Sequence, residues 1–472
     1  MFTRRSFITG SIAATACLLA ETGCQSVKTG APTDELIAEG LKAALEKTLY
    51  PALRERAYPG HFMVVADGHS YGEENTWCGL DSWEMAGAYL LVGKQREVLD
   101  YFDVVQAAQR KDGNIPFAIF PADRPLPSPD SYLRAIRFPQ EVYTYTPRVR
   151  PGQPGHASMK PRKWIGLYTH WQTKVNPLST LGAASYILTA AEIYAAMKSK
   201  SWLREKMESI EAAGNYLLSR ISPNGLMGGA GFYIESPPRN QWDGVTQCYG
   251  IYIFRQLAVM NRALGRSSVA KQWRQHADKL SSHFQYFFWL KDHFAEYVHP
   301  EHGVVDAHGL SDVNWAAIGL GVARDRQAKV LWPILTGEPA FWHGNMPTQL
   351  VAKPKSYQAW ELPEPLPFSY DTPTRDAAAM GRVWHLEALA CRRMKDDRRL
   401  RQSVIYVCKA GKQHDWSWYE RYPVGKNGSL QHDGTAKYCE YAAVLVRVVL
   451  GNPEVFSEAK HYGQKGVVRI KV

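Results

Sequence analysis

Two acidic side chains in this sequence stand beside aromatic residues in segments that are far apart in the chain. Glu420 lies in "DWSWYERYP", and Asp243 follows Trp242 in "QWDG". Aromatic faces stack on sugar rings, and a pair of positioned carboxyl groups is the chemistry that cleaves a glycosidic bond. The structural alternative is that the aromatics pack a core edge, Glu420 pairs with Arg421, and Asp243 caps the helix that follows.

The elements that must position these acids are predicted to be helices. Apolar residues recur at three- and four-residue spacing in twelve segments, several of them in adjacent pairs separated by short turns. The fold is therefore predicted to be all-α: one domain of six helical hairpins closed into a ring, with long irregular loops between the pairs. The twelve segments are 33–49, 82–93, 95–109, 179–197, 201–221, 245–264, 269–289, 310–323, 326–335, 374–394, 398–411 and 435–450.

The first 23 residues read as an export signal rather than as part of the fold. "TRRSFIT" places two arginines before a moderately apolar run that is too short to span a membrane. Gly23 and Cys24 resemble a lipoprotein cleavage site, although Glu21 departs from that pattern. We predict a twin-arginine signal at 1–23, a linker at 24–33 and the helical domain at 34–472. Either Cys24 is lipidated or an ordinary peptidase cuts nearby, and the predicted location is the periplasm or cell envelope.

Charge and cysteine usage limit the classes of partner. The net charge is +11, and it falls to +10 without residues 1–23, which hold Arg4, Arg5 and Glu21. No run of five like charges occurs, so a nucleic-acid partner is not expected. The basic balance either favours an acidic glycan or serves solubility. No CxxC or metal-spaced cluster appears, so no disulfide framework, metal or other cofactor is expected.

Three motifs in order resemble the six-hairpin glycosidases, which include trehalases, processing α-glucosidases, debranching enzymes and rhamnosidases. The motifs are "LDSW" followed by "DGNIP", then "QWDG" before a long helix, then "WYERYPVGKNG" before the last helix. The resemblance spans residues 60–452. It implies an (α/α)6 barrel and an inverting glycoside hydrolase acting on an oligo- or polysaccharide. It implies Glu420 as general base and an acid in the "QWDG" loop, where Asp243 is preferred to Glu235.

The same resemblance implies that the acid of "LDSW" and its neighbouring aromatics hold the sugar in the central subsite. Other aromatic and polar residues near helix starts are candidates for lining the cleft, although Asp312 also suits a helix cap. The predicted substrate-binding residues are Asp81, Trp83, Trp77, Trp171, His170, Trp242, Trp418, Tyr422 and Asp312.

Two other classes stay open on the sequence alone. Helical toroids also serve polysaccharide lyases and unsaturated-glucuronyl hydrolases, for which Tyr422, His170 and Arg239 would suit an acidic glycan. A non-catalytic glycan-binding lipoprotein would keep the aromatics and lack a working carboxylate pair. Reaction products separate the three classes, because a lyase leaves an unsaturated product, a hydrolase leaves none, and a binder leaves the glycan intact.

Overall fold

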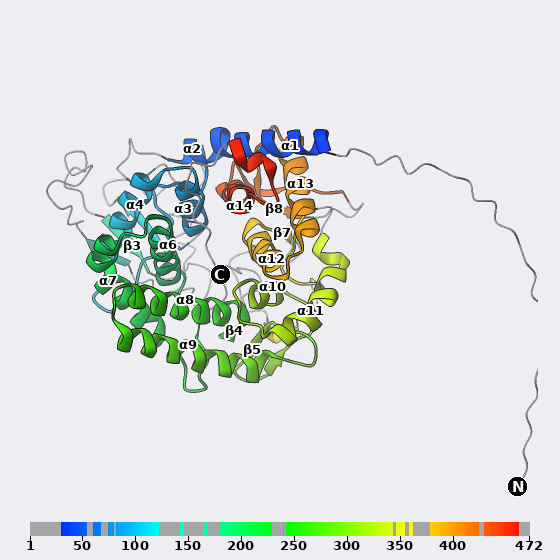
Figure 1. Cartoon of the computed structure of the whole chain (residues 1–472). Helices are drawn as coiled ribbons and strands as arrows, with labels where there is room; N and C mark the ends of the chain where they lie inside the picture. The colour runs from blue at the N-terminus through cyan, green and yellow to red at the C-terminus, as the bar shows by residue number, and fades with distance from the viewer. Residues whose placement is uncertain are drawn as a thin grey trace, which may run out of the picture.

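The computed structural model has a mainly helical chain, as the sequence predicts (Figure 1). Six of the helices pack each against the next, and the last packs against the first, so they close a ring. These inner helices are α3 (Ser82–Leu91), α6 (Leu181–Met197), α8 (Gly244–Ala263), α10 (Asp312–Gly319), α12 (Gly381–Met394) and α14 (Cys439–Gly451). The structure describes residues 30–53, 60–67, 74–79, 82–121, 142–145, 164–168, 180–228, 239, 242–342, 346–354, 358–361, 378–423 and 429–461.

An outer helix follows five of the inner helices after a turn of two to five residues. These outer helices are α4 (Gln95–Ala107), α7 (Lys200–Ser219), α9 (Ser267–Phe288), α11 (Asp325–Gly337) and α13 (Asp397–Gln413). The sixth inner helix, α14, is covered by the first segment of the chain, α1 (Gly30–Ala43), with its continuations η1 (Ala44–Leu49) and α2 (Tyr50–Ala52). The amino-terminal segment therefore completes the last pair, and it begins inside the predicted linker.

The burial of each helix follows from its apolar pattern. In α6 most residues are apolar or small, and the first ten side chains are all buried, which is what a helix packed on both sides requires. In α9 the buried side chains recur at three- and four-residue spacing and form one stripe, so the opposite face meets solvent. That stripe consists of Ala270, Trp273, Ala277, Leu280, Phe284 and Phe288. The width of the apolar face thus separates inner from outer helices.

The long connections, which lead from each outer helix to the next inner helix, lie together at one end of the ring. Backbone bridges join them neighbour to neighbour: Thr76 with Ile119, Ser311 with Val351, and Val65 with Tyr438. Each inner helix begins at this long-connection end and must therefore finish at the opposite one, where the short turns lie. Hydrogen bonds from Arg255 of α8 and Arg393 of α12 to carbonyls at the end of α10 and in the α10–α11 turn join three neighbouring pairs at this end.

Three small antiparallel sheets lie in the long connections, where the sequence predicts irregular loops, while the mainly helical character is as predicted. Their strand orders are β1-β3-β2, β4-β5-β6 and β7-β8-β9. The strands are β1 (Ala118–Pro121), β2 (Val142–Tyr145), β3 (Trp164–Leu167), β4 (Trp242–Asp243), β5 (Tyr297–His299), β6 (Gly303–Val305), β7 (Ala378–Ala379), β8 (Tyr419–Pro423) and β9 (Asp433–Ala436). Short 3-10 turns complete the set: η2 (Pro339–Trp342), η3 (Ala359–Glu361) and η5 (Ser457–His461).

Two predicted helix starts move for the same reason. The segments predicted to begin at residues 374 and 435 become helical at Gly381 and Cys439, because β7 and β9 pair with β8 instead. Pairing with a distant strand overrides the local helix preference of the alanine-rich segment. Among the described residues, no helix has the length and apolar character needed to cross a bilayer.

Candidate functional site

Asp243 ends β4 and caps the first turn of α8. Its Oδ2 accepts a hydrogen bond from the backbone N–H of Thr246 at 2.7 Å, and its Oδ1 accepts one from Arg239 Nη1 at 2.7 Å. The side chain is fully buried. Trp242 points the other way, since successive side chains of a strand alternate, and its indole N–H donates to Ser222 at 3.0 Å. The capping alternative is therefore realised, and the burial of Asp243 comes from its ionic neighbours.

Arg239 is the centre of a buried ion cluster at this end of the ring. Besides Asp243, its guanidinium donates to Glu296 at 2.6 Å and to Asp312 at 2.6 Å. Glu296 directly precedes β5, and Asp312 is the first residue of α10. One cation thus holds carboxylates from three segments that are far apart in sequence, and each of the three approaches a different nitrogen.

A second cation, His308, lies on the other side of Glu296. Its Nδ1 is hydrogen-bonded to Glu296, and its Nε2 lies 3.3 Å from Glu361, which also accepts from the Tyr297 hydroxyl. Burial alone would lower the pKa of His308, but the bonds to Glu296 and Glu361 raise that pKa to about 9. The imidazole is therefore charged at neutral pH, and the cluster holds two cations against four carboxyl groups.

The excess of carboxyl groups affects Asp243 and Asp312 most. Burial raises the pKa of Asp312 to about 6, against the opposing attraction of Arg239. Burial also raises the pKa of Asp243, although Arg239 and the Thr246 N–H favour its ionised form. Arg239 and His308 hold the pKa of Glu296 below its usual value despite its burial. The cluster can therefore keep one proton near neutral pH, shared by the two aspartates that flank Arg239.

Glu420 lies in β8, in the connection that leads into α14. Its Oε1 accepts from Arg421 Nη1 at 3.0 Å, and Arg421 also reaches Asp433 of β9 at 3.1 Å. The ladder between β8 and β9 shifts register beside Glu420. Gly434 faces the acid across this shift: with φ +77 it has a backbone suited to glycine, and a Cβ there would stand 2.5 Å from Glu420 Oε2. The pairing with Arg421 that the structural alternative expects is present.

Two of the aromatic side chains near Glu420 in the sequence pack against helices, one against α13 and one against α14. Trp418 is fully buried, donates its indole N–H to the Val407 carbonyl of α13 at 3.0 Å, and packs on Gly411. Tyr422 is also fully buried, accepts from the Tyr419 N–H at 3.1 Å, and meets Tyr441 of α14 edge to face. Both predicted sugar contacts thus serve as packing residues between β8 and its neighbouring helices.

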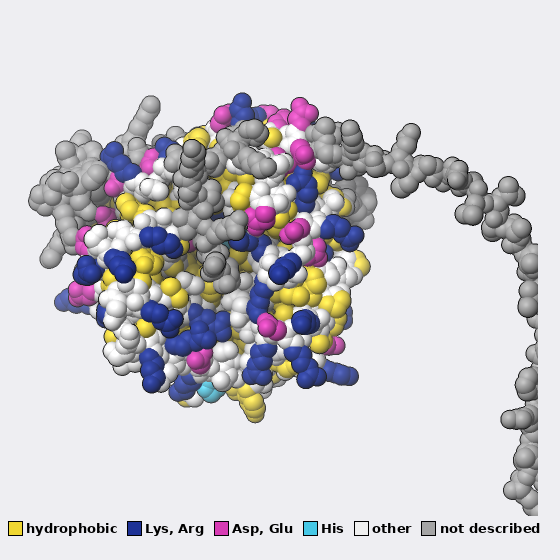
Figure 2. Space-filling model, viewed as in Figure 1, with side chains coloured by type: hydrophobic (Ala, Val, Ile, Leu, Met, Phe, Trp, Pro, Cys, Tyr) yellow, Lys and Arg dark blue, Asp and Glu magenta, His cyan; other side chains and the backbone are white. Residues whose placement is uncertain are grey.

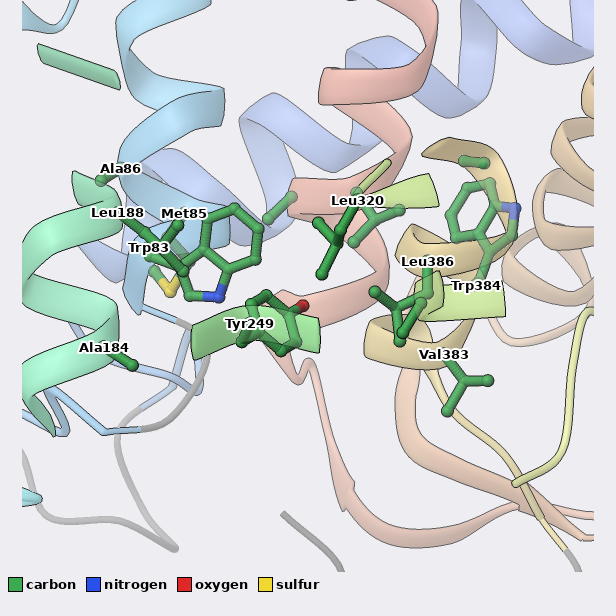
Figure 3. Close-up of a cluster of buried hydrophobic side chains, with 14 of the residues drawn as sticks. Trp83, Met85, Ala86, Ala184, Leu188, Tyr249, Leu320, Val383, Trp384 and Leu386 are labelled. Carbon is green, nitrogen blue, oxygen red and sulfur yellow. The ribbon is translucent and has the colours of Figure 1, made fainter. Parts of the chain in front are cut away.

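Trp83 crosses the interior of the ring near its long-connection end. Its ring lies 6.1 Å from that of Tyr249 in α8 and 4.9 Å from that of His385 in α12, centroid to centroid. Helix α3 does not neighbour either α8 or α12 in the ring, so these contacts span the interior. We call the layer that Trp83, Tyr249 and His385 form across the ring the floor. Figure 3 shows Trp83 beside Tyr249, with Leu386 of α12 across from them. The indole N–H of Trp83 is buried and finds no hydrogen-bond partner in the described part of the chain.

The charged groups of the floor are arranged in pairs. Arg447 of α14 donates to both oxygens of Glu192 in α6, at 2.8 and 2.5 Å, and its guanidinium lies 4.9 Å from the Trp83 ring. Glu84 lies 3.8 Å from His385. Burial, helped by the positive charge of Arg447, lowers the pKa of His385 well below its usual value, so the imidazole is neutral.

The remaining predicted residues are placed as follows. Trp77 is buried against Phe117, and its carbonyl accepts from the Ser82 hydroxyl, so it packs at the start of α3. Asp312 lies in the Arg239 cluster, and Trp83 lies at the floor. Glu420 lies in the β7-β8-β9 sheet, whereas Asp243 of the cluster lies in the β4-β5-β6 sheet. The predicted residues Glu235, Asp81, His170, Trp171 and Cys24 lie outside the described part of the chain.

The sequence reasoning missed most of the ion cluster and of the floor. Glu296 and Glu361 carried no motif, and His308 stood four residues before Asp312 without a distinguishing pattern. The sequence does contain one indication that Glu296 is a buried acid, because it interrupts the apolar run "FAEYV" at the start of β5. An acid in such a run needs a buried cation as partner, and the sequence alone does not show which one.

Comparison with solved structures supports the fold. The chain is similar to the GH63 mannosylglycerate hydrolase from Thermus thermophilus in complex with glucose, with a TM-score of 0.55, 11% identity, and coverage of 87% of this chain and 99% of that one. It is similar to the GH78 rhamnosidase of Bacillus sp. GL1, with a TM-score of 0.53 and 13% identity over 88% of this chain. A rhamnosidase from Klebsiella oxytoca with rhamnose bound gives 0.52 and 11% identity over 89% of this chain.

The coverage and sequence identity of these matches limit what they establish about this chain. The chain spans 35% of the Bacillus rhamnosidase and 64% of the Klebsiella one. No protein-family model and no curated protein sequence matches the chain. At identities of 11–13% the likeness establishes a shared helical-barrel fold, as expected from the motifs, and activity has to be argued from the site.

Proposed function

We propose that the protein is an exported glycoside hydrolase in which the ring of inner helices is the inner layer of a six-hairpin (α/α)6 barrel. The supporting observation is the placement of acids: Glu420 and the Arg239 cluster both lie in connections that enter inner helices at the same end of the ring. The floor of Trp83 and His385 lies just inside that end. A sugar resting on the floor would meet carboxyl groups from above, which is the arrangement that glycosidic cleavage needs.

In the proposed reaction, one carboxyl group protonates the leaving oxygen while Glu420 takes a proton from the attacking water. The proton donor is the aspartate pair around Arg239, because that pair can hold a proton near neutral pH. Asp243 remains the preferred general acid, as the sequence indicated, and Asp312 is a second candidate because it is slightly less buried. Glu235 remains the alternative acid in the same loop. Inversion requires about 6.5–9.5 Å between acid and base, which leaves room for the water.

The charge of the floor favours an uncharged sugar over a uronate. Its arginine, Arg447, is already held by both oxygens of Glu192, and His385 is neutral. Glu84 adds a further carboxyl group. A substrate carboxylate placed there would lie near the carboxyl groups of Glu192 and Glu84, whereas an uncharged sugar would not be repelled by them. The buried N–H of Trp83 instead suits the hydroxyl oxygen of a neutral sugar.

The same contacts weigh against the lyase alternative. A lyase needs a cation to neutralise the substrate carboxylate, and Arg239 already binds three protein carboxylates. Its base must be reachable, whereas Tyr422 is fully buried and its hydroxyl accepts a hydrogen bond from Tyr419. Burial raises the pKa of Tyr422, which moves it further from the role of a base.

The test is a panel of neutral and acidic oligosaccharides incubated with purified protein, with products identified by mass spectrometry and the product anomer by NMR. Glu420→Gln should retain binding and lower turnover by roughly 10²-fold or more. A wild-type protein that leaves every glycan intact would remove the hydrolase proposal, and an unsaturated product would establish the lyase class instead.

The acid is identified with a substrate whose activated leaving group needs little protonation. Loss of the true acid should slow ordinary glycosides by roughly 10²-fold or more and spare the activated substrate. The variants to compare are Asp243→Asn, Asp312→Asn and Glu235→Gln. If Glu235→Gln alone shows this pattern, the Arg239 cluster is structural.

Export by the twin-arginine route and lipidation of Cys24 are part of the proposal. The supporting features are Arg4, Arg5 and the Gly23–Cys24 pair in the sequence. Replacing both arginines with lysine should leave the protein in the cytoplasm. Mass spectrometry of the exported chain distinguishes a lipid on Cys24 from a plain new terminus.

A further inference from the structure

The short turns between inner and outer helices concentrate exposed basic residues at one end of the ring. Exposed acids in these turns are few: Asp325 and Asp397. The exposed basic residues, which we call the basic turn set, are Lys198, Lys200, Arg262, Arg324, Arg326, Lys395 and Arg398. They come from four turns that follow α6, α8, α10 and α12. The exposed charge of these four turns is therefore mainly positive.

Helix dipoles explain only part of this excess. Inner helices end here, and cations near their last carbonyls are favourable. Arg255 and Arg393 serve that purpose directly, since they donate to carbonyls at the end of α10 and in the α10–α11 turn. Lys200, Arg326 and Arg398, however, occupy the first turns of outer helices, where the dipole disfavours a cation. The helix dipoles therefore do not favour the cations at these three positions.

We propose that this end of the ring docks on a membrane surface of anionic phospholipid headgroups. Because the basic turn set is distributed over successive turns around the ring, it presents charge over an area rather than along a track. An area of charge suits a planar anionic surface, whereas a linear polyanion needs cations in a line. Figure 2 shows Lys and Arg side chains spread over one face of the molecule, with fewer Asp and Glu side chains among them.

The sequence before α1 agrees with such docking. The candidate lipidation site at Cys24 lies six residues before Gly30, where α1 begins. A chain of that length spans at most about 20 Å, which would keep the ring close to a bilayer. With the turns on the headgroups, the long-connection end faces away from the membrane, toward soluble glycans. This last consequence rests on the proposed function, while the docking itself does not.

The experiment measures vesicle binding by the full chain carrying Cys24→Ser, so that no lipid contributes. Vesicles of phosphatidylcholine with phosphatidylglycerol should bind the protein, pure phosphatidylcholine should not, and added salt should weaken the binding. The triple variant Lys198→Glu, Arg326→Glu and Lys395→Glu reverses charge in three turns. Each cation near an anionic surface contributes roughly a fivefold change, so binding should fall by roughly 10²-fold or more.

The control reverses the same number of charges elsewhere on the outer helices: Lys42→Glu, Lys279→Glu and Lys409→Glu. Circular dichroism should show both triple variants folded. Equal loss in the control would mean that net charge alone drives binding, and the docking surface would be rejected. The proposal is also overturned if the parent protein ignores phosphatidylglycerol at low salt, or if it binds heparin but not the vesicles, which would assign the turn end to a polyanionic glycan.

Discussion

Arg239→Met removes the cation that three buried carboxylates share, while keeping a side chain of similar length. Asp243, Glu296 and Asp312 each lose a hydrogen bond of 2.6–2.7 Å to a charged donor. A hydrogen bond to a charged group contributes about 1.5–3 kcal/mol, and removing one partner of a buried ion pair costs about 3–5 kcal/mol. Because the three losses are not additive, we expect the free energy of unfolding to fall by about 5 kcal/mol at neutral pH.

The loss should depend on pH in a definite direction. Without Arg239, the folded state holds its carboxyl groups protonated more readily than the unfolded chain, so their folded pKa values rise. A carboxyl group with a raised folded pKa destabilises the fold as the pH rises above its unfolded pKa of about 4. One extra proton held by the folded variant corresponds to about 1.4 kcal/mol per pH unit. Between about pH 7.5 and about pH 5, the loss should therefore shrink by about 3 kcal/mol.

Urea unfolding followed by circular dichroism at both pH values measures this effect. Arg274→Met is the matched control, because Arg274 makes an exposed pair with Asp278 and should change stability by less than about 1 kcal/mol at either pH. Adding Asp312→Asn to Arg239→Met removes one uncompensated charge and should recover part of the loss. The reasoning is refuted if Arg239→Met costs under about 1 kcal/mol, or costs the same at both pH values.

Three further changes test other parts of the molecule. Gly434→Ala should displace Glu420, because its Cβ would stand 2.5 Å from Oε2, and should lower turnover on the true substrate by roughly tenfold or more. Gly265→Ala has a similar φ of +78 with open space, so it should cost similar stability and leave turnover unchanged. Gly87→Ala would place a Cβ 1.6 Å from Arg447 Nη1 and break its pair with Glu192, so calorimetry should show a loss of about 3 kcal/mol. Gly337→Ala, with no neighbour within 4 Å, should be neutral or stabilising. His308, with its pKa raised to about 9, contributes stability that is complete below about pH 6.5 and lost as the pH rises through 9. His308→Gln should reduce the decrease of the unfolding free energy with pH in that range. The pKa of His293 is also raised to about 9, by its hydrogen bonds to Asp306 and Asp292, so His293 should account for the pH dependence that remains. An unchanged slope in His308→Gln would show that the buried imidazole is neutral.

Apolar periodicity was enough to predict the helices, because a helix that packs against a core must repeat its apolar residues every three or four positions. It failed at the starts of α12 and α14, where "AA" of β7 and "DGTA" of β9 are strands. β7 pairs with β8, which lies beyond α12 and α13 in the sequence, and no local pattern at β7 contains that information. β9 pairs back onto β8, the strand that precedes it, so its pairing is local but is not visible in the apolar spacing.

The positions of Asp243 and Glu420 were predictable, but their surroundings were not. A carboxylate before a long helix and another before the last helix are visible in the sequence. The neighbours that set their chemistry come from elsewhere: Glu296 reaches Arg239 across 57 positions and Asp312 across 73. These contacts exist because the ring brings the entrances of α8 and α10 together. Trp418, predicted to bind substrate beside Glu420, instead donates its indole N–H to a carbonyl of α13.

The direction of the inner helices gives a physical reason why carboxylate chemistry would sit at the long-connection end. Six helices begin there, and the positive ends of their dipoles stabilise ionised acids. That setting suits Glu420 in its proposed role, because a base must be charged, and Arg421 lies beside it. It opposes an acid that must stay protonated. Such an acid needs burial and competing negative charge, and the Arg239 cluster supplies both by placing four carboxyl groups around two cations. The two proposed roles can then share one end of the ring, because Glu420 is paired with Arg421, whereas the aspartates are buried and share Arg239 with Glu296.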